Sequence, residues 1–160
     1  MPPVQLAGAL ADRRDVPLGD HCPIDRTLQV VGHRTSLLLL REVFYGARRF
    51  DALVKRTGMT EAVASQRLRG LVEAGLLTRE PYREEGQRTR HEYVLTASGH
   101  AFLPVLVALI EWGQAHVPGA RGELAISHAD CGERVRLEVR CTAGHVVPED
   151  ELVVEGRRKL

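Results

Sequence analysis

The sequence predicts an α+β protein that is mainly α-helical, and three observations support this class. Apolar residues recur at helical spacing in the stretches 23–31, 37–44, 52–57, 61–74 and 97–116. Two strand candidates, residues 76–82 and 90–95, are joined by a polar loop that contains glycine. After residue 119 the pattern changes to an alternation of apolar and charged residues, which predicts a small β appendage.

Composition and length are those of an ordinary globular protein. The 160 residues include 22 Lys and Arg against 21 Asp and Glu, with a mean hydropathy of −0.16, which argues against disorder and fibre. Three cysteines are too few and too unevenly spaced for the disulfide framework of a secreted module. Residues 1–11 lack a signal-peptide pattern, and the most apolar stretch, 102–110, is about half as long as a membrane span. We therefore expect a cytoplasmic protein with no membrane partner.

The first two helices follow a flexible arm. Residues 1–21 show no sustained periodicity and carry proline, glycine and both charge signs, which is typical of a mobile segment. Pro23 suits the first position of a short helix, where its missing N–H costs nothing, and Gly32 ends that helix. The next helix, residues 37–44, is apolar nearly all round and is predicted to lie at the centre of the core, closed by Gly46.

Two further helices carry predicted caps, and the second of them has two contrasting faces. Asp51 is expected to cap the third helix, which ends at Gly58, and Thr60 to cap the fourth, which Gly75 closes. The apolar side of the fourth helix is formed by Ala64, Leu68 and Leu71. Its other side is small and polar, and is formed by Glu61, Ala62, Ser65, Gln66 and Arg69.

The last helix carries more apolar surface than one core needs. Thr96 is predicted to cap a long helix that runs to about residue 116, and its apolar surface is wider than one packing stripe. The excess predicts a homodimer that is built from this helix and the helix over residues 23–31. The predicted contact residues are Leu28, Leu106, Leu109, Ile110 and Trp112.

The charge distribution and the order of the elements together predict a DNA-binding function. Residues 48–90 contain ten Lys and Arg against six Asp and Glu, although the whole chain is nearly neutral. Two helices, a turn, a helix with a polar face and a basic hairpin form the winged helix-turn-helix order, in which one helix enters the major groove and the hairpin flanks it. The predicted domains are a flexible arm (1–21), a winged-helix DNA-binding and dimerisation domain (22–117) and a small β-hairpin appendage (118–160). Double-stranded DNA is the predicted partner.

Several short motifs occur in an order and at spacings that belong together. They are Cys22-Pro23-Ile24, Gly32-His33-Arg34-Thr35-Ser36, Arg49-Phe50-Asp51-Ala52-Leu53, Gln66-Arg67-Leu68, Gly75-Leu76-Leu77 and Tyr93-Val94-Leu95-Thr96. Together they resemble the HxlR-type winged helix-turn-helix transcriptional regulators, over residues 20–116. The resemblance implies a dimeric bacterial regulator. Two positions depart from the family pattern, because Thr35 stands where the family usually carries Trp and His91 where it usually carries an aliphatic residue.

The predicted DNA contacts fall into two classes. Ser65, Gln66 and Arg69 are candidates for reading bases, because an amide or guanidinium on an exposed helix face can pair with base edges. Charge alone suffices for phosphates, so cations on the helix flank and in the hairpin are the backbone candidates. These are Arg67, Arg83, Arg88 and Arg90, and Arg34 and Thr60 complete the predicted DNA-binding set. The alternative for each residue is an ordinary solvated side chain.

Cys22 is a candidate redox sensor. It stands immediately before a helix that begins with Pro23, where unpaired backbone N–H groups and the helix dipole favour a thiolate. The resemblance implies the same, because members of the family often carry cysteine here and some respond to reactive electrophiles. The alternative is a small apolar packing residue. A small-molecule effector is a further expectation, with a pocket lined by ordinary apolar side chains.

Two His and two Cys near the end of the chain form a candidate zinc set. His128, Cys131, Cys141 and His145 flank a β segment with the ligand chemistry of structural zinc. A zinc ribbon normally carries Cys-x-x-Cys at both turns, and this spacing matches only in part. A metal-free hairpin is the main alternative, and a disulfide between Cys131 and Cys141 is another. No other cofactor is expected.

An enzymatic function is not expected. A nucleophilic role for Cys22 would need His21 or His33 as its base, and the sequence places no third orienting group or oxyanion element beside them. The remaining alternative to a DNA-binding regulator is a winged-helix module that contacts only proteins.

Overall fold

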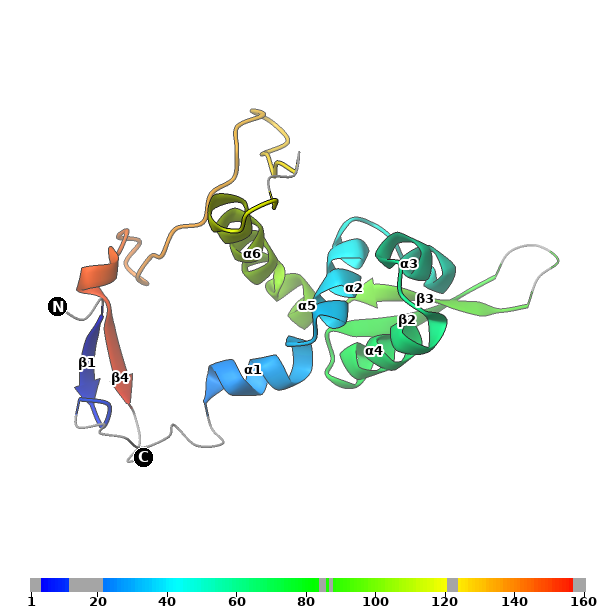
Figure 1. The fold of residues 1–160 in the computed structure, drawn as a ribbon, viewed down its shortest axis with the longest axis horizontal. Helices are drawn as coiled ribbons and strands as arrows, with labels where there is room; N and C mark the ends of the chain where they lie inside the picture. The colour runs from blue at the N-terminus through cyan, green and yellow to red at the C-terminus, as the bar shows by residue number, and fades with distance from the viewer. Residues whose placement is uncertain (1–3, 12–21, 84–85, 87, 121–123, 157–160) are drawn as a thin grey trace. The chain divides into compact units, whose positions relative to one another are not determined.

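The chain divides into two compact units in the computed structural model, which describes residues 4–11, 22–83, 86, 88–120 and 124–156 (Figure 1). One unit is continuous, Ile24–Leu124, and carries the helices. The other combines Met1–Pro23 with Ala125–Leu160. The predicted class, α+β and mainly α-helical, is confirmed by the order of the described elements.

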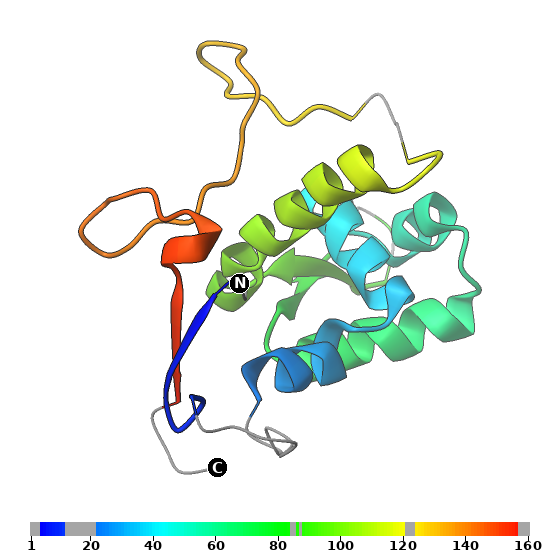
Figure 2. The ribbon, with the colours of Figure 1, turned by 60° about the vertical axis from the view of Figure 1, so that its left-hand side comes forward.

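The helical unit is organised around α2. Its described elements are α1 (Pro23–Val31), α2 (Arg34–Phe44), α3 (Phe50–Thr57), α4 (Glu61–Glu73), β2 (Leu77–Tyr82), β3 (Arg90–Leu95), α5 (Ala97–Ala101) and α6 (Leu103–His116). α2 contacts α3, α4, β3 and α6, and Figure 2 shows it between α4 and α6. Leu39 and Leu40 of α2 are fully buried. The apolar run therefore forms the middle of the core, as the sequence predicts.

The hairpin of β2 and β3 is antiparallel and has a short third partner. Leu77 pairs with Leu95 at one end of the hairpin and Tyr82 with Arg90 at the other. The segment before α3 joins the free edge of β3, because Arg49 and Glu92 form an isolated bridge and the Tyr93 N–H donates to the Arg48 carbonyl at 2.8 Å. The sequence therefore predicted both strands to within one residue.

Two of the three predicted helix caps are confirmed. The Thr60 hydroxyl accepts a hydrogen bond from the Val63 N–H at 3.4 Å, and the Thr96 hydroxyl accepts one from the Gly99 N–H at 3.1 Å. The predicted cap by Asp51 is wrong, because α3 begins at Phe50 and Arg49 is its N-cap. The strand-like bridge at Arg49 explains this start, since the chain leaves the extended conformation directly after it.

The predicted single helix over residues 97–116 is broken in two at Phe102. α5 ends at Ala101, and α6 begins at Leu103 with Pro104 in its first turn. A proline inside a continuous helix would lose a hydrogen bond and clash with the preceding turn, so the helix restarts at the position that tolerates proline.

Gly99 allows α5 to lie directly against the turn between α4 and β2. A Cβ atom at Gly99 would stand 2.2 Å from the Leu76 carbonyl oxygen, which no side chain tolerates. The Thr96 hydroxyl donates to the Gly75 carbonyl at 2.5 Å, and the Thr96 N–H donates to the Leu76 carbonyl at 3.1 Å. The end of α4 is therefore tied to the start of α5.

The second unit joins the two ends of the chain through a parallel strand pair. β1 (Gln5–Gly8) pairs with β4 (Val153–Gly156), and Gln5 stands opposite Val153. The sequence predicts a flexible arm over residues 1–21, and the structure instead places a strand within it; residues 12–21 lie outside the described residues. β1 was missed because four residues are too few to show a period.

The alternation of apolar and charged residues after residue 119, which is most regular over residues 134–140, does not form the predicted strand. Only isolated bridges occur there, between Ser127 and Arg134 and between Arg140 and Val146, and a 3-10 turn follows at Glu149–Glu151. Among the described residues of this unit, 4–11, 22–23 and 125–156, none is buried. The alternating apolar side chains are therefore not covered by another element. Burial of one apolar face is what normally stabilises a strand, and it is missing here.

None of the helices in the described ranges is both long enough and apolar enough to cross a membrane.

Candidate nucleic-acid interface

α3 and α4 form a helix-turn-helix whose outward face is set by its buried side. α3 ends at Gly58, which adopts a left-handed backbone conformation with φ of 66°. The packed side of the pair is completely buried and consists of Leu53, Ala64, Leu68 and Leu71. Because these side chains hold both helices against α2, α4 has one rotational position, and its opposite face points to solvent.

The predicted base-reading residues lie on that outward face. Gln66 and Arg69 are exposed, and Ser65 is half-buried at its edge. Positions 62, 65, 66 and 69 are spaced by three and four residues, so they share one side of the helix. An amide and a guanidinium on this surface have the chemistry for two-point contacts with base edges.

Arg67 is half-buried on the flank of α4. Together with Gln66, it lines a recess of about 280 Å³ beside α1 and the start of α2, where His33 and Ser36 are also found. Its Nε atom is buried and has no hydrogen-bond partner among the described residues. The sequence held a signal for this position, because residue 67 stands three residues after Ala64 and four before Leu71 in the buried stripe.

The hairpin of β2 and β3 and its connecting loop form the wing of the winged helix. The base of this wing is stabilised by contacts that the sequence did not predict. The Arg49 guanidinium carbon lies 4.8 Å from the centroid of the Tyr82 ring, a cation–π distance. Arg79 Nη2 donates to His91 Nδ1 at 3.3 Å across the two strands, and Arg48 forms an ion pair with Glu92 at 3.4 Å. His91 is thus a hydrogen-bonding partner of β2 at a position where an aliphatic side chain was expected.

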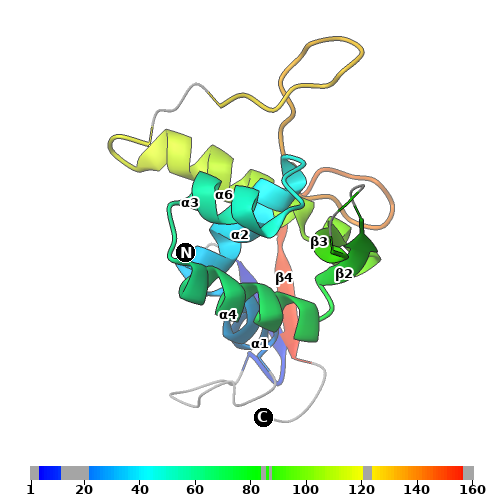
Figure 3. The ribbon, with the colours of Figure 1, turned by 90° about the vertical axis from the view of Figure 1, so that its right-hand side faces the viewer.

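The described ends of the wing loop carry three cations. β2 and β3, which lead to this loop, extend beyond α3 and α4 in Figure 1 and lie to one side of these helices in Figure 3. Arg83, Arg88 and Arg90 are all exposed, in keeping with their predicted contacts to phosphates. Residues 84, 85 and 87 lie outside the described residues. Arg34 is exposed at the start of α2, and Thr60 is exposed beside its cap.

A buried carboxylate links α2 to α3, and residue spacing alone does not predict this contact. Glu42 on α2 is 6% exposed and accepts a hydrogen bond from Arg41 Nη2 at 2.6 Å. Its second oxygen lies 3.9 Å from Arg56 Nη1 on α3. Because a buried carboxylate must be compensated, this pairing holds the α3 end of the helix-turn-helix against α2.

The predicted dimer residues differ in their exposure to solvent. Leu28 on α1 and Leu109 and Trp112 on α6 are exposed, with 61% of the Trp112 surface accessible. Ile110 is half-buried. Leu106 is 8% exposed and belongs to the core of this chain, so its predicted place in an interface is corrected. Leu106 follows Phe102 by four residues and shares its buried face.

The structure does not bring the four candidate zinc ligands together. His128 Nδ1 lies 3.2 Å from Cys131 Sγ within one turn, and the backbone N–H of Cys141 donates to the His145 carbonyl within the next. Each pair occupies its own tight turn, so the two pairs do not converge. No group of three or more His, Cys, Asp or Glu side chains in the described ranges could hold a metal ion.

All three cysteines are free, and Cys22 is half-buried directly before α1. His21 lies outside the described residues, and no hydrogen bond joins Cys22 to His33 within them. The nucleophile and base that an enzyme would need are therefore not assembled from the described side chains.

Comparison with known proteins gives a consistent result. A family model described as HxlR-like helix-turn-helix matches residues 30–120. An uncharacterized HTH-type transcriptional regulator of Mycobacterium tuberculosis, Rv3095, is 39% identical over 134 residues, which cover 79% of this chain and 84% of the relative. Another, sll1512 of Synechocystis, is 36% identical over 96 residues, or 59% of this chain and 70% of the relative.

Solved structures share the fold. The crystal structure of PA1607, described as a candidate transcription factor, is 34% identical with a TM-score of 0.75, covering 88% of this chain and 97% of that protein. The reduced form of the redox regulator HypR is 26% identical with a TM-score of 0.55, covering 61% of this chain and 95% of HypR. The fold is therefore that of winged-helix transcription factors, as the order of the elements predicts.

Proposed function

The chain belongs to the HxlR-like helix-turn-helix family, and on this premise we propose that it acts as a homodimer on an inverted-repeat operator. It is a DNA-binding transcriptional regulator, like the relatives that it matches. The observation that carries the proposal is the outward face of α4, where Gln66 and Arg69 are exposed opposite a completely buried stripe. We infer that this face reads bases in the major groove.

The uncovered apolar surfaces of α1 and α6 support the homodimer. Ile24, Leu28, Leu109 and Trp112 are all exposed, and each would cost free energy in water. In a dimer with twofold symmetry, the same surface of each chain lies in the interface, so these apolar side chains are removed from water in both copies. Such a dimer presents two α4 helices to half-sites that lie about one turn of DNA, or a multiple of it, apart.

We assign the wing to the DNA backbone. Arg83, Arg88 and Arg90 are exposed, and the pairing of a guanidinium with a phosphate does not depend on the DNA sequence. Arg34 and Thr60, at the starts of α2 and α4, are assigned to the same class of contact. Arg67 is assigned to the recess beside α1, because its Nε atom is buried there.

The remaining assignments follow from this role. DNA binding and dimerisation belong to residues 22–117, and the compact unit Ile24–Leu124 supports this boundary. We assign residues 118–160 to the appendage, and the compact unit that combines Met1–Pro23 with Ala125–Leu160 adds the β1 segment to it. A regulator of chromosomal DNA acts in the cytoplasm of a bacterium, and no catalytic step is assigned to it. Cys22 is the proposed entry point for a thiol-reactive signal, and a packing role is its alternative; HypR, a structural neighbour, is a redox regulator.

Selection from random DNA tests the operator proposal. Fragments that the full chain retains at moderate salt are sequenced, and the protected region is mapped by footprinting. We expect enrichment of an inverted repeat with half-site centres about ten base pairs, or a multiple, apart. Enrichment of a single unpaired half-site would refute the dimeric mode. Uniform retention of all fragments, or no retention, would favour a winged helix that contacts only proteins.

A further inference from the structure

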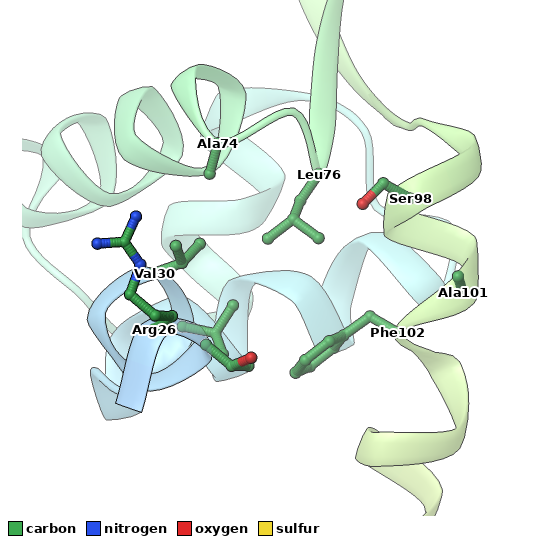
Figure 4. A pocket seen from close by; sticks show the side chains of 9 residues that line it. Arg26, Val30, Ala74, Leu76, Ser98, Ala101 and Phe102 are labelled. Atoms are coloured by element: carbon green, nitrogen blue, oxygen red, sulfur yellow. The ribbon is translucent and has the colours of Figure 1, made fainter. Parts of the chain in front are cut away.

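A cavity of about 460 Å³ lies between α1, the turn that joins α4 to β2, and α5 (Figure 4). Val31, Leu76 and Phe102 belong to the core and line its apolar part. Figure 4 shows Val30, Leu76 and Phe102 around the same space, and Arg26 extending toward the end of α4 that carries Ala74. The volume lies within the range of about 300–1,000 Å³ that small-molecule sites occupy.

The charge of the lining is positive. Arg26 is the charged member of the lining set, and no carboxylate belongs to that set within the described residues. No described residue forms an ion pair or hydrogen bond with Arg26, so within the described part of the chain its guanidinium is available to an acidic group. Ser98 supplies a hydroxyl on the side of α5. An apolar chamber with a guanidinium at its edge has the chemistry for a molecule with an apolar body and one acidic group.

We propose that this cavity is an effector site for small monocarboxylic acids with an aromatic or aliphatic body. The carboxylate pairs with Arg26, and the apolar body displaces water from the surfaces of Val31, Leu76 and Phe102. The inference rests on the proposed function, because an effector has a role only in a protein that binds DNA. It assigns a ligand class to a cavity whose lining residues lie outside the base-reading face of α4.

The walls of the cavity connect the ligand to the DNA-reading helix. Leu76 comes three residues after the end of α4, and its carbonyl accepts hydrogen bonds from the Thr96 N–H and hydroxyl at 3.1 and 3.3 Å. Arg26 and Val31 belong to α1, which carries part of the proposed dimer surface. A ligand between these elements therefore changes the position of α4 relative to α1. In a dimer, that displacement changes the separation of the two reading helices and hence the affinity for the operator.

Calorimetric titration of the full chain tests the site without any DNA. The probes are benzoate, octanoate and 2-naphthoate, and the matched uncharged probe is 2-naphthamide. We expect saturable binding of one acid per chain, at least about tenfold tighter than binding of the amide, because a charge-assisted pair with Arg26 is lost in the amide. Binding of none of the three acids, or equal binding of acid and amide, would overturn the proposal.

Variants locate the binding within the chain. Arg26→Gln should weaken 2-naphthoate by about tenfold or more, and Ala101→Trp, at an exposed lining position, should fill the cavity and abolish binding. Lys55→Gln removes an exposed cation elsewhere and should change nothing. Thermal melting confirms that each variant folds. Unchanged affinity in Arg26→Gln would overturn the site even if the acid binds.

The DNA-linked step has its own readout. Gel shift with the selected operator, with and without 2-naphthoate, should show a change in affinity that Arg26→Gln removes. If the acid binds but the operator affinity stays constant, the cavity is a binding site without the proposed regulatory role. If no operator is ever selected, the proposed function fails, whereas the calorimetric result still decides the ligand class.

Discussion

At the scale of single residues, neighbours in the sequence of α4 differ in how far they are buried. Gln66 is exposed and borders the recess beside α1, whereas Arg67 is half-buried and its Nε atom is covered. Successive residues of a helix stand about 100° apart, so adjacent polar residues can differ in their access to DNA. The class of a side chain therefore depends on its rotational position relative to Ala64, Leu68 and Leu71.

The first prediction separates base reading from phosphate binding. Gln66→Ala and Arg69→Ala should relax the choice of particular bases by about 1–3 kcal/mol, because each removes a two-point contact with a base edge. Arg83→Ala and Arg88→Ala should weaken binding to all sequences alike and lower the salt slope by about one per lost phosphate contact. Affinities for operator and scrambled DNA at several salt concentrations give both quantities. A changed specificity ratio in the wing variants alone would show that the wing, and not α4, reads the operator.

The second prediction concerns thiol chemistry. Alkylation of the wild-type chain should change DNA binding, and Cys22→Ser should remove that effect, because Cys22 stands at the start of a helix in the proposed dimer surface. Cys131→Ser and Cys141→Ser are matched controls at exposed positions and should leave the effect intact. Gel shifts before and after treatment with N-ethylmaleimide measure it. A Cys22 thiol that reacts no faster than a free peptide cysteine would instead be a packing group.

At the scale of elements, the period of the apolar residues predicted those helices and strands that are determined by packing against a neighbouring element. α2, α4 and both strands of the hairpin follow from apolar spacing, because their apolar residues pack into or against the core. α1 shows the same spacing, but Val31 is its one buried residue in this chain. The exposed reading face of α4 follows from the same pattern. The caps at Thr60 and Thr96 were predictable because each hydroxyl satisfies an N–H within three residues.

The features that sequence reasoning missed depend on distant partners. α3 starts at Phe50 because Arg49 bridges to Glu92, which is 43 positions away in the chain. The pairing of β1 with β4, the contact of Arg79 with His91 and the ion pairs of Glu42 also join segments whose proximity no local pattern encodes. The break at Phe102 is different, because a local signal for it was present. Pro104 favours a helix start at this point, but the continuous apolar surface on both sides of it led to the prediction of one helix.

The third prediction tests the close approach of α5 to the end of α4. Gly99→Ala should lower the free energy of unfolding by about 1–3 kcal/mol, because its Cβ would overlap the Leu76 carbonyl and the backbone must shift. Gly70→Ala is the matched control in α4, where no atom lies within 4 Å of the new Cβ. It should raise stability by about 0.5–1 kcal/mol. Urea unfolding measures both, and equal changes in the two variants would mean that α5 does not pack as described.

At the scale of the whole molecule, the two units differ in how they bury apolar surface. The helical unit has a continuous core from Val31 to Leu106, whereas the described residues of the second unit include no buried side chain. Apolar side chains that remain exposed on the helical unit are concentrated on α1 and α6. Association of two chains through α1 and α6 would therefore bury apolar side chains that remain exposed in a single chain.

The fourth prediction tests that association. Leu109→Glu combined with Trp112→Glu should convert the dimer to monomers, because each buried charge would oppose the interface by several kcal/mol. Val139→Glu places the same charge at an exposed apolar position of the second unit and should leave the dimer unchanged. Sedimentation velocity distinguishes the species. A dimer that survives the double substitution would place the interface on another surface.

The parallel pairing of β1 with β4 imposes an order of events on the ribosome. Gln5 is synthesised 148 residues before its partner Val153. At about 5–20 residues per second, β1 waits roughly 7–30 s for that partner. The helical unit contains only segments made in between, so it can complete its core during this interval. Pairing of β1 with β4 then follows completion of the helical unit, and a nascent chain stalled before Val153 would carry an intact DNA-reading unit and an unpaired β1.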